Sequence, residues 1–178
     1  MAISRATDDW GSAGVDEPVP PAALRATMAD FASGVTIVTS QWQGVAHAMT
    51  ATAFCSVSLD PPLVLVCVSK ASRFHQAVVN ADRWAVSLLS STQEAVARHF
   101  ANRGRDLLTQ FDRVPHLVGA VSGAPLIDGA LAWLECETYA QHDGGDHTIL
   151  VGRVRRTSNR ASADPPLTYH RGAYSSTK

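Results

Sequence analysis

The feature that most constrains the fold is a pair of β-forming runs separated by a very short turn. The runs are residues 54–59 and 63–69, and Asp60-Pro61-Pro62 joins them. β-Branched and aromatic residues favour strands, and a tight turn between two such runs is typical of neighbouring strands. Because the second run is almost continuously apolar, we expect it to be buried on both faces of a sheet.

Further short strands and only three helices are expected along the rest of the chain. The other expected strands are 35–39, 45–49, 84–89, 131–139, 148–155 and 167–169. Residues 103–130, rich in Gly and Asp, are expected to be an irregular surface stretch. The expected helices are one that begins at Pro20-Pro21 and ends before Ser33-Gly34, one over 72–80 that Ser72 caps, and one that runs to about Asn102. The last should begin with a capping box over residues 91–94, with Glu94 at its third position. This pattern predicts a mainly β fold, an antiparallel barrel that is closed or half closed.

Composition indicates one globular domain. The chain has 178 residues, 46% apolar and 17% charged, with a net charge of −1, which argues against nucleic-acid binding. Residues 1–19 lack periodicity and a secretion signal, so we expect a disordered tail before a domain over 20–174. No run is long enough to cross a membrane. Cys55, Cys67 and Cys136 lack metal-site spacing and are expected in the core, which fits a cytoplasmic protein.

Small polar residues stand at both ends of the strand pair and predict an anion pocket. Thr50-Ala51-Thr52-Ala53 precedes the first run, and Ser69-Lys70-Ala71-Ser72 follows the second. A helix that begins behind Ser72 would offer free N–H groups to a phosphate. By alternation, a row of hydroxyls should share one strand face, and its members are Thr50, Thr52, Ser56 and Ser58. An ordinary solvated strand face is the alternative interpretation of that row.

Two further clusters are candidates for ligand contacts. His142 and His147 flank Gly144-Gly145 within a predicted turn over 141–146. A metal pair across such a flexible turn is disfavoured, so no metal is expected; a turn that directs His147 into a pocket and a solvated histidine both stay open. Tyr169 begins an aromatic and cationic segment near the C-terminus, which would suit either ring stacking or strand packing. No nucleophile–base pair, Rossmann fingerprint or P-loop is present, so any chemistry is expected to come from a cofactor.

Several segments, in order and spacing, resemble the short-chain flavin reductases of two-component flavin-dependent monooxygenases. They are residues 31–39, 48–68, 69–74, 145–154 and 166–174. The resemblance implies a split β-barrel of Greek-key antiparallel, FMN-binding type and a homodimer. It also implies reduction of FMN or FAD by NADH or NADPH, with the reduced flavin passed to a separate monooxygenase.

The resemblance also assigns residues to the two ligands. Flavin contacts fall on Thr50, Ala51, Thr52 and Ala53 along the ribityl chain and ring, on Ser58, Leu59 and Asp60 at the pyrimidine edge, and on Ser69, Lys70 and Ser72 at the phosphate. The resemblance implies that Asp146, His147 and Tyr169 bind the nicotinamide nucleotide, with His147 as the catalytic residue that orients it.

Two other barrel functions are the alternatives to a reductase. One is a protein that holds FMN for storage or electron relay without reducing it, and the Asp146-His147 and Tyr169 elements favour the enzyme over it. The other is a related barrel that binds heme or a deazaflavin. Such a barrel would need an axial ligand or a more basic pocket, and the sequence shows neither. The choices of FMN or FAD and of NADH or NADPH stay open, with Arg155, Arg156 and Arg171 as candidates for a 2′-phosphate contact.

Overall fold

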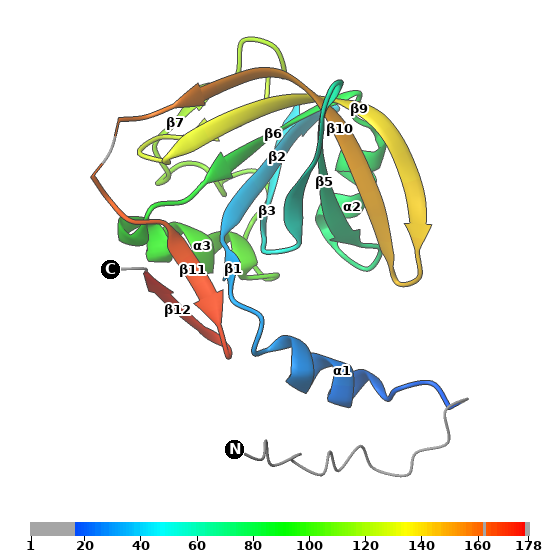
Figure 1. Cartoon of the computed structure of the whole chain (residues 1–178). Coiled ribbons are helices and arrows are strands. Elements are labelled where there is room, and N and C mark those ends of the chain that lie inside the picture. Colours follow the sequence, from blue (N-terminus) through cyan, green and yellow to red (C-terminus); the bar gives the residue numbers. More distant parts are fainter. Residues whose placement is uncertain (1–16, 162, 177–178) are drawn as a thin grey trace.

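The computed structural model describes residues 17–161 and 163–176. These residues form a seven-stranded antiparallel sheet, two smaller sheets and three α-helices (Figure 1). The predicted mainly β, antiparallel class is therefore confirmed. Most of the predicted tail over 1–19 lies outside the described residues. No helix within the described ranges has the length and apolar character needed to cross a membrane.

The bounds of the elements are as follows. In spatial order the large sheet contains β3 (Val45–Ala51), β2 (Thr36–Trp42), β6 (Arg83–Leu88), β9 (Ala132–Gly144), β10 (His147–Asn159), β5 (Pro62–Ser69) and β4 (Phe54–Leu59). The helical elements are α1 (Pro21–Met28), α2 (Arg73–Asn80), the 3-10 turn η1 (Ser91–Gln93) and α3 (Glu94–Ala101). The small sheets contain β1 (Ser33–Gly34), β11 (Leu167–His170) and β12 (Ala173–Ser176), and β7 (His116–Val118) with β8 (Pro125–Ile127).

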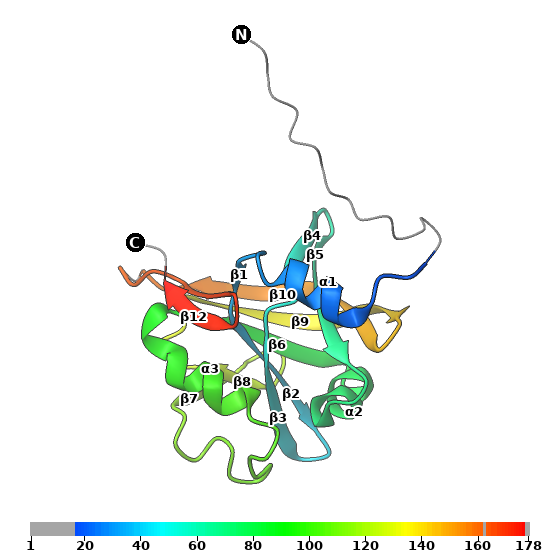
Figure 2. The same cartoon turned by 90° about the horizontal axis from the view of Figure 1, so that it is seen from below.

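The large sheet has to curl, because its two edge strands are consecutive in the chain. β3 and β4 stand at opposite ends of the hydrogen-bonding order, yet only Thr52 and Ala53 separate them. Such a link spans about 10 Å, whereas the edges of a flat seven-stranded sheet would lie about 29 Å apart. The sheet is strongly curved (Figure 2), and no β3–β4 ladder occurs among the described strands. The predicted half-closed barrel thus has an open seam between β3 and β4.

Two apolar clusters fill the curved sheet. The first surrounds the fully buried Trp84 and includes Val66, Val68 and Leu150 from the strands beside the seam. α2 covers it with Phe74 and other apolar residues of one helix face. The second lies under α3, which buries Phe100 against Ile37 and neighbouring side chains. Both helices therefore pack their apolar faces on the barrel while their ends stay near its open seam.

The predicted row of hydroxyls on one strand face is wrong. β3 ends at Ala51, so residues 52 and 53 form a corner rather than strand. The β4–β5 ladder also shifts register between Ser56 and Ser58. A corner and a bulge each change which face a side chain takes, so simple alternation does not hold across this segment.

The burial expected for β5 and for two cysteines also needs correction. One face of β5 is buried, but Leu65 and Cys67 on the other face are only half buried, and Cys55 on β4 is exposed. β4 is the edge strand of the sheet, and its Val57 and Leu59 are exposed as well. Cys136 alone among the three cysteines is a core residue, as expected.

Several predicted element bounds were wrong as well. α1 ends at Met28, not at Ser33-Gly34, and it buries no residue. The capping box begins at Ser90, with Gln93 as its partner, one residue before the expected position. The β9–β10 hairpin runs through most of the predicted turn over 141–146, so that only Gly145 and Asp146 form its tip. The segment 103–130, expected to be irregular, contains the short β7–β8 hairpin, and β12 was not foreseen.

Gly152 provides a stability test of the core. A Cβ added there would lie 2.3 Å from Cζ2 of Trp84 and 3.0 Å from Cβ of Cys136. Because Trp84 is fully buried and cannot move aside, we expect Gly152→Ala to lower the free energy of unfolding by about 1–3 kcal/mol. Urea denaturation followed by tryptophan fluorescence measures this loss. Gly34→Ala, where nothing lies within 4 Å of the added carbon, is the matched control; equal stability of the two variants would contradict the packing argument.

Candidate functional site

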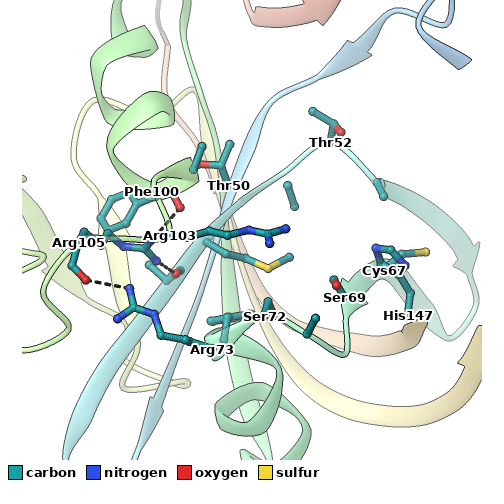
Figure 3. A pocket seen from close by; sticks show the side chains of 17 residues that line it. Thr50, Thr52, Cys67, Ser69, Ser72, Arg73, Phe100, Arg103, Arg105 and His147 are labelled. Carbon is teal, nitrogen blue, oxygen red and sulfur yellow. Dashed lines mark hydrogen bonds between the residues drawn. The ribbon is translucent and has the colours of Figure 1, made fainter. Parts of the chain in front are cut away.

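A cavity of about 390 Å³ lies at the open seam (Figure 3). Its walls come from the end of β3, the 52–53 corner, the end of β5, the start of α2 and the segment that follows α3. Many of the residues predicted from sequence to bind a ligand meet here: Thr50, Ala51, Thr52, Ala53, Ser69, Ser72 and His147. The structure thus brings together two of the predicted clusters, which lie far apart in the chain.

The cavity lining is strongly cationic. Arg73, Arg103 and Arg105 line it together with His147, and among the described residues no aspartate or glutamate does, although the whole chain has a net charge of −1. α2 begins at the same wall, capped by Ser72, whose hydroxyl accepts a hydrogen bond from the His75 amide at 3.1 Å. The first N–H groups of a helix lack partners within the helix and carry its positive dipole end. The cavity is therefore complementary to a phosphate or another anion.

The guanidinium of Arg105 donates its hydrogen bonds to other residues of the protein. Its guanidinium donates to the carbonyl oxygens of Phe100 at 2.9 Å, Asn102 at 2.7 Å and Ala48, and its Nε donates to Oε1 of Gln110 at 2.9 Å. Burial, and then the nearby charge of Arg73, lower the pKa of Arg105 to about 10. Arg105 thus fastens the segment after α3 to β3 and shapes the cavity wall.

Arg73 and Arg103 differ in whether their N–H donors already have hydrogen-bond partners. Arg73 donates from Nη2 to the carbonyl oxygen of Arg105 at 2.8 Å, which turns it toward the segment after α3. Arg103 makes no hydrogen bond or ion pair with any residue in the described ranges, and Figure 3 shows its side chain extending across the cavity between Thr50 and Ser72. Arg103 is therefore the cation whose donors are available to a ligand.

His147 enters the cavity from the start of β10. It lies opposite Ser69 in the β5–β10 register, and its Nδ1 lies 2.7 Å from Oδ1 of Asp146. The hydrogen bond from His147 lowers the pKa of Asp146, so this carboxylate is ionised and only accepts. Nδ1 therefore carries the proton of the pair, which leaves Nε2 for a ligand. Asp146 orients His147 in this arrangement and does not itself line the cavity.

Lys70 lies outside the lining of the cavity. Its ammonium donates to Asp143 and to the carbonyl oxygen of Gly145 at 2.6 Å, and its amide donates to the carbonyl of Asp146 at 2.9 Å. The hydrogen bond and charge of Lys70 lower the pKa of Asp143. Lys70 thus ties the tip of the β9–β10 hairpin to the end of β5, immediately beside His147.

The remaining predicted residues lie elsewhere. Ser58 and the 93% exposed Leu59 end β4, Asp60 begins the turn into β5, and all three line none of the described cavities. Tyr169 lines a second groove, of about 760 Å³, between α1 and β11, where its ring lies 5.1 Å from that of Tyr174. Thr52 and Ala53 line both the groove and the cavity. The 52–53 corner is therefore the wall that the two hollows share.

The end of α3 and the segment after it supply cavity residues that sequence reasoning missed. Phe100, Arg103 and Arg105 line the cavity, but residues 103–130 were interpreted as an irregular surface stretch. Three arginines within residues 98–105 were the available signal. No group of three histidine, cysteine, aspartate or glutamate side chains within 17–161 and 163–176 is arranged to hold a metal ion.

Known proteins are similar to this chain in sequence and in fold. An NADH-dependent FAD reductase of Streptomyces globisporus is 47% identical over 142 residues, which cover 78% of this chain and 76% of that protein. The reductase subunit HsaB of a flavin-dependent monooxygenase from Mycobacterium tuberculosis is 33% identical over 157 residues, 88% of this chain and 82% of that protein. A solved structure, the NADH:FAD oxidoreductase of Streptomyces globisporus C-1027 in complex with NAD and FAD fragments, superposes with a TM-score of 0.83 at 42% identity, covering 91% of this chain and 97% of that chain.

The family profile agrees with these likenesses over most of the chain. The flavin reductase like domain matches residues 28–178, which include every wall of the cavity. The family suggested by the sequence segments is thereby confirmed. This chain belongs to the family of proteins with a flavin reductase like domain.

Proposed function

We propose that this protein is an NADH-dependent flavin reductase that supplies reduced flavin to a separate monooxygenase. The observation that carries the proposal is the seam cavity, in which an anion-complementary helix start, small alanines and His147 meet. The relatives named above, one an NADH-dependent FAD reductase and one the reductase subunit of a flavin-dependent monooxygenase, support the same activity.

The residues of the cavity suit a flavin. Ala51 and Ala53 add little bulk to the wall, so that a flat ring can lie against it, while Thr50 and Thr52 offer hydroxyls beside it. The Thr50 hydroxyl donates to the carbonyl of Ala97 at 2.6 Å and so still accepts from a ligand. Ser69 and Ser72, next to the start of α2, suit the flavin phosphate. Ring, ribityl chain and phosphate thus each have a matching wall.

The protein's part in the reaction is to position the two ligands. When both are bound, the nicotinamide supplies a hydride to the flavin ring. Good alignment of two reactants is worth effective molarities of order 10⁵ M or more, so the residues need only hold the rings together and exclude water. His147, oriented through Asp146, is placed to hold the nicotinamide nucleotide against the flavin face. No side chain is required as a nucleophile or general base.

Three further features belong to the proposal. A homodimer would cover α1 and the turn after it, where Leu24, Met28 and Phe31 are more than half exposed. A cytoplasmic location would suit the three free cysteines. NADH rather than NADPH is preferred, because Arg155, Arg156 and Arg171, the candidates for a 2′-phosphate contact, are each paired with a carboxylate.

The proposal is tested by adding NADH and then FMN or FAD to the purified protein and following NADH absorbance. We expect rapid oxidation that depends on added flavin, since the flavin is the electron acceptor. Repeating the assay with NADPH measures the donor preference. A protein that binds flavin but oxidises neither nucleotide would instead be a flavin-binding or electron-relay protein, and one that does neither would contradict both functions.

Removing the imidazole of His147 should separate nucleotide use from flavin binding. We expect His147→Ala to lower kcat/KM for NADH about tenfold or more, because misalignment of the rings costs rate steeply. The flavin Kd, measured by calorimetry, should stay nearly unchanged. His142→Ala, on the same hairpin but outside the cavity, is the matched control. Unchanged kinetics in His147→Ala would remove this residue from the site.

Lys70 distinguishes a hairpin clamp from a phosphate ligand. If its role is to hold the β9–β10 tip and thereby His147, Lys70→Met and Asp143→Asn should raise the KM for NADH to a similar extent. Because the pair is exposed, we expect only about two- to fivefold. Weaker flavin binding in Lys70→Met, but not in Asp143→Asn, would instead make Lys70 the phosphate ligand that the family resemblance implies.

A further inference from the structure

The segment after α3 adds a second anion position to the cavity, separate from the start of α2. The α2 position consists of helix N–H groups beside Ser69 and Ser72. The second is the guanidinium of Arg103, which comes from the opposite wall (Figure 3). Two anion positions in one cavity suit a ligand that carries two phosphates in succession.

Arg103 is the only arginine of the lining whose donors no described residue uses. Arg105 donates to backbone carbonyls, and Arg73 donates to the carbonyl of Arg105. A guanidinium presents several N–H donors in a fixed plane and binds phosphate oxygens bidentately. Within residues 17–161 and 163–176, no aspartate or glutamate lines the cavity and competes for the Arg103 guanidinium.

The wall that carries Arg103 is held firmly enough to recognise a ligand. Arg105 donates to the carbonyls of Phe100 and Asn102 at the end of α3, and it also donates to the carbonyl of Ala48 on β3. The Gln110 amide donates to the carbonyl of Ala46 at 2.8 Å and adds a second tie to β3. Arg103 therefore projects from a braced segment, which lowers the cost of ordering its surroundings on binding.

The arrangement along the cavity indicates which ligand uses both positions. Figure 3 shows His147 and Cys67 at one end, Ser69 and Ser72 between, and Phe100 with Arg105 at the other end. With the flavin ring beside His147 and its phosphate beside Ser72, a ligand that continues past Arg103 toward the end with Phe100 and Arg105 is longer than FMN. FMN ends at one phosphate, whereas FAD carries a second phosphate and an adenosine beyond it.

We propose that Arg103 binds the second phosphate of FAD and makes this protein select FAD over FMN. The inference rests on the proposed function, because it places a flavin in the cavity. Arg103 is a specificity residue in this role: it contacts the part of the flavin that does not react, so it acts on flavin affinity and leaves the rate of hydride transfer alone.

The test is Arg103→Gln, which removes the charge but keeps much of the length of the side chain. Kinetics with NADH give KM and kcat for FAD and for FMN, and calorimetry gives the Kd of each flavin without turnover. We expect KM and Kd for FAD to rise about tenfold, the cost of losing one charge-assisted contact at a solvent-accessible position. The values for FMN should change less than about threefold, and kcat should hold for both flavins.

Two variants provide controls. Arg113→Gln makes the same charge change in the same segment, on a side chain that lines a different cavity, and should leave both flavins unaffected. Arg103→Lys retains the charge without the planar fork and should recover part of the preference for FAD.

Each of the other outcomes overturns the inference. An equal loss for FAD and FMN would place Arg103 on the phosphate that both share, and a rise in the KM for NADH alone would place it on the nucleotide. A wild-type protein that reduces FMN as efficiently as FAD would also refute the selection while leaving the reductase activity standing. A wild-type protein that oxidises NADH with neither flavin would instead refute the proposed function.

Discussion

The length of the link between β3 and β4 is the constraint on which the structure depends. Two residues cannot cross an open seven-stranded sheet, so the sheet has to curl until its edges approach. The link then lies at the seam, where the Cys67 amide donates to the carbonyl of Ala53 at 3.0 Å. The same corner forms a wall of the cavity and of the groove beside it. Fold closure and ligand site are thus consequences of one short connection.

The opposite wall of the cavity depends on how β5 ends. Ser69 is the last residue of β5 and pairs with His147, and α2 begins only a few residues later, at Arg73. A helix start and a histidine from a distant hairpin are therefore placed side by side by strand register alone. Because charge is concentrated here in a chain whose net charge is −1, attraction of an anionic ligand is local to the seam and is not a property of the whole surface.

The parts of this arrangement that could be predicted from sequence are those set by neighbouring residues. The strand at Phe54–Leu59, the turn after it and the Ser72 cap each follow from local patterns, and the structure has them as expected. The family segments added the grouping of Thr50 to Ala53 with His147, which alternation and turn chemistry alone left open. Pairing across the sheet was not predictable in this way. Strand alternation failed where a corner and a bulge changed the faces of β3 and β4.

Local sequence patterns could not predict which charged residues pair with one another either. Lys70 is surrounded in sequence by small polar residues and therefore resembles a phosphate ligand, yet its partner Asp143 lies 73 positions away in the chain. Arg103, Arg105 and Arg73 have similar compositional contexts, and only the fold separates the two that bond to backbone from the one that does not. Which cation serves a ligand is decided by which carbonyls and carboxylates the fold brings within reach of the others.

The described residues leave apolar side chains exposed on both flanks of the seam. An eight-residue helix is marginal in water without packing, yet α1 buries none of its residues. Met28 and Phe31 face the groove that shares Thr52 and Ala53 with the cavity. On the far side of the seam, Val57 and Leu59 on the edge strand β4 are also exposed. In the proposed homodimer, a second copy of the chain would cover the apolar surface on both flanks of the seam. The contact that covers α1 would then also shape the outer wall of the proposed flavin site.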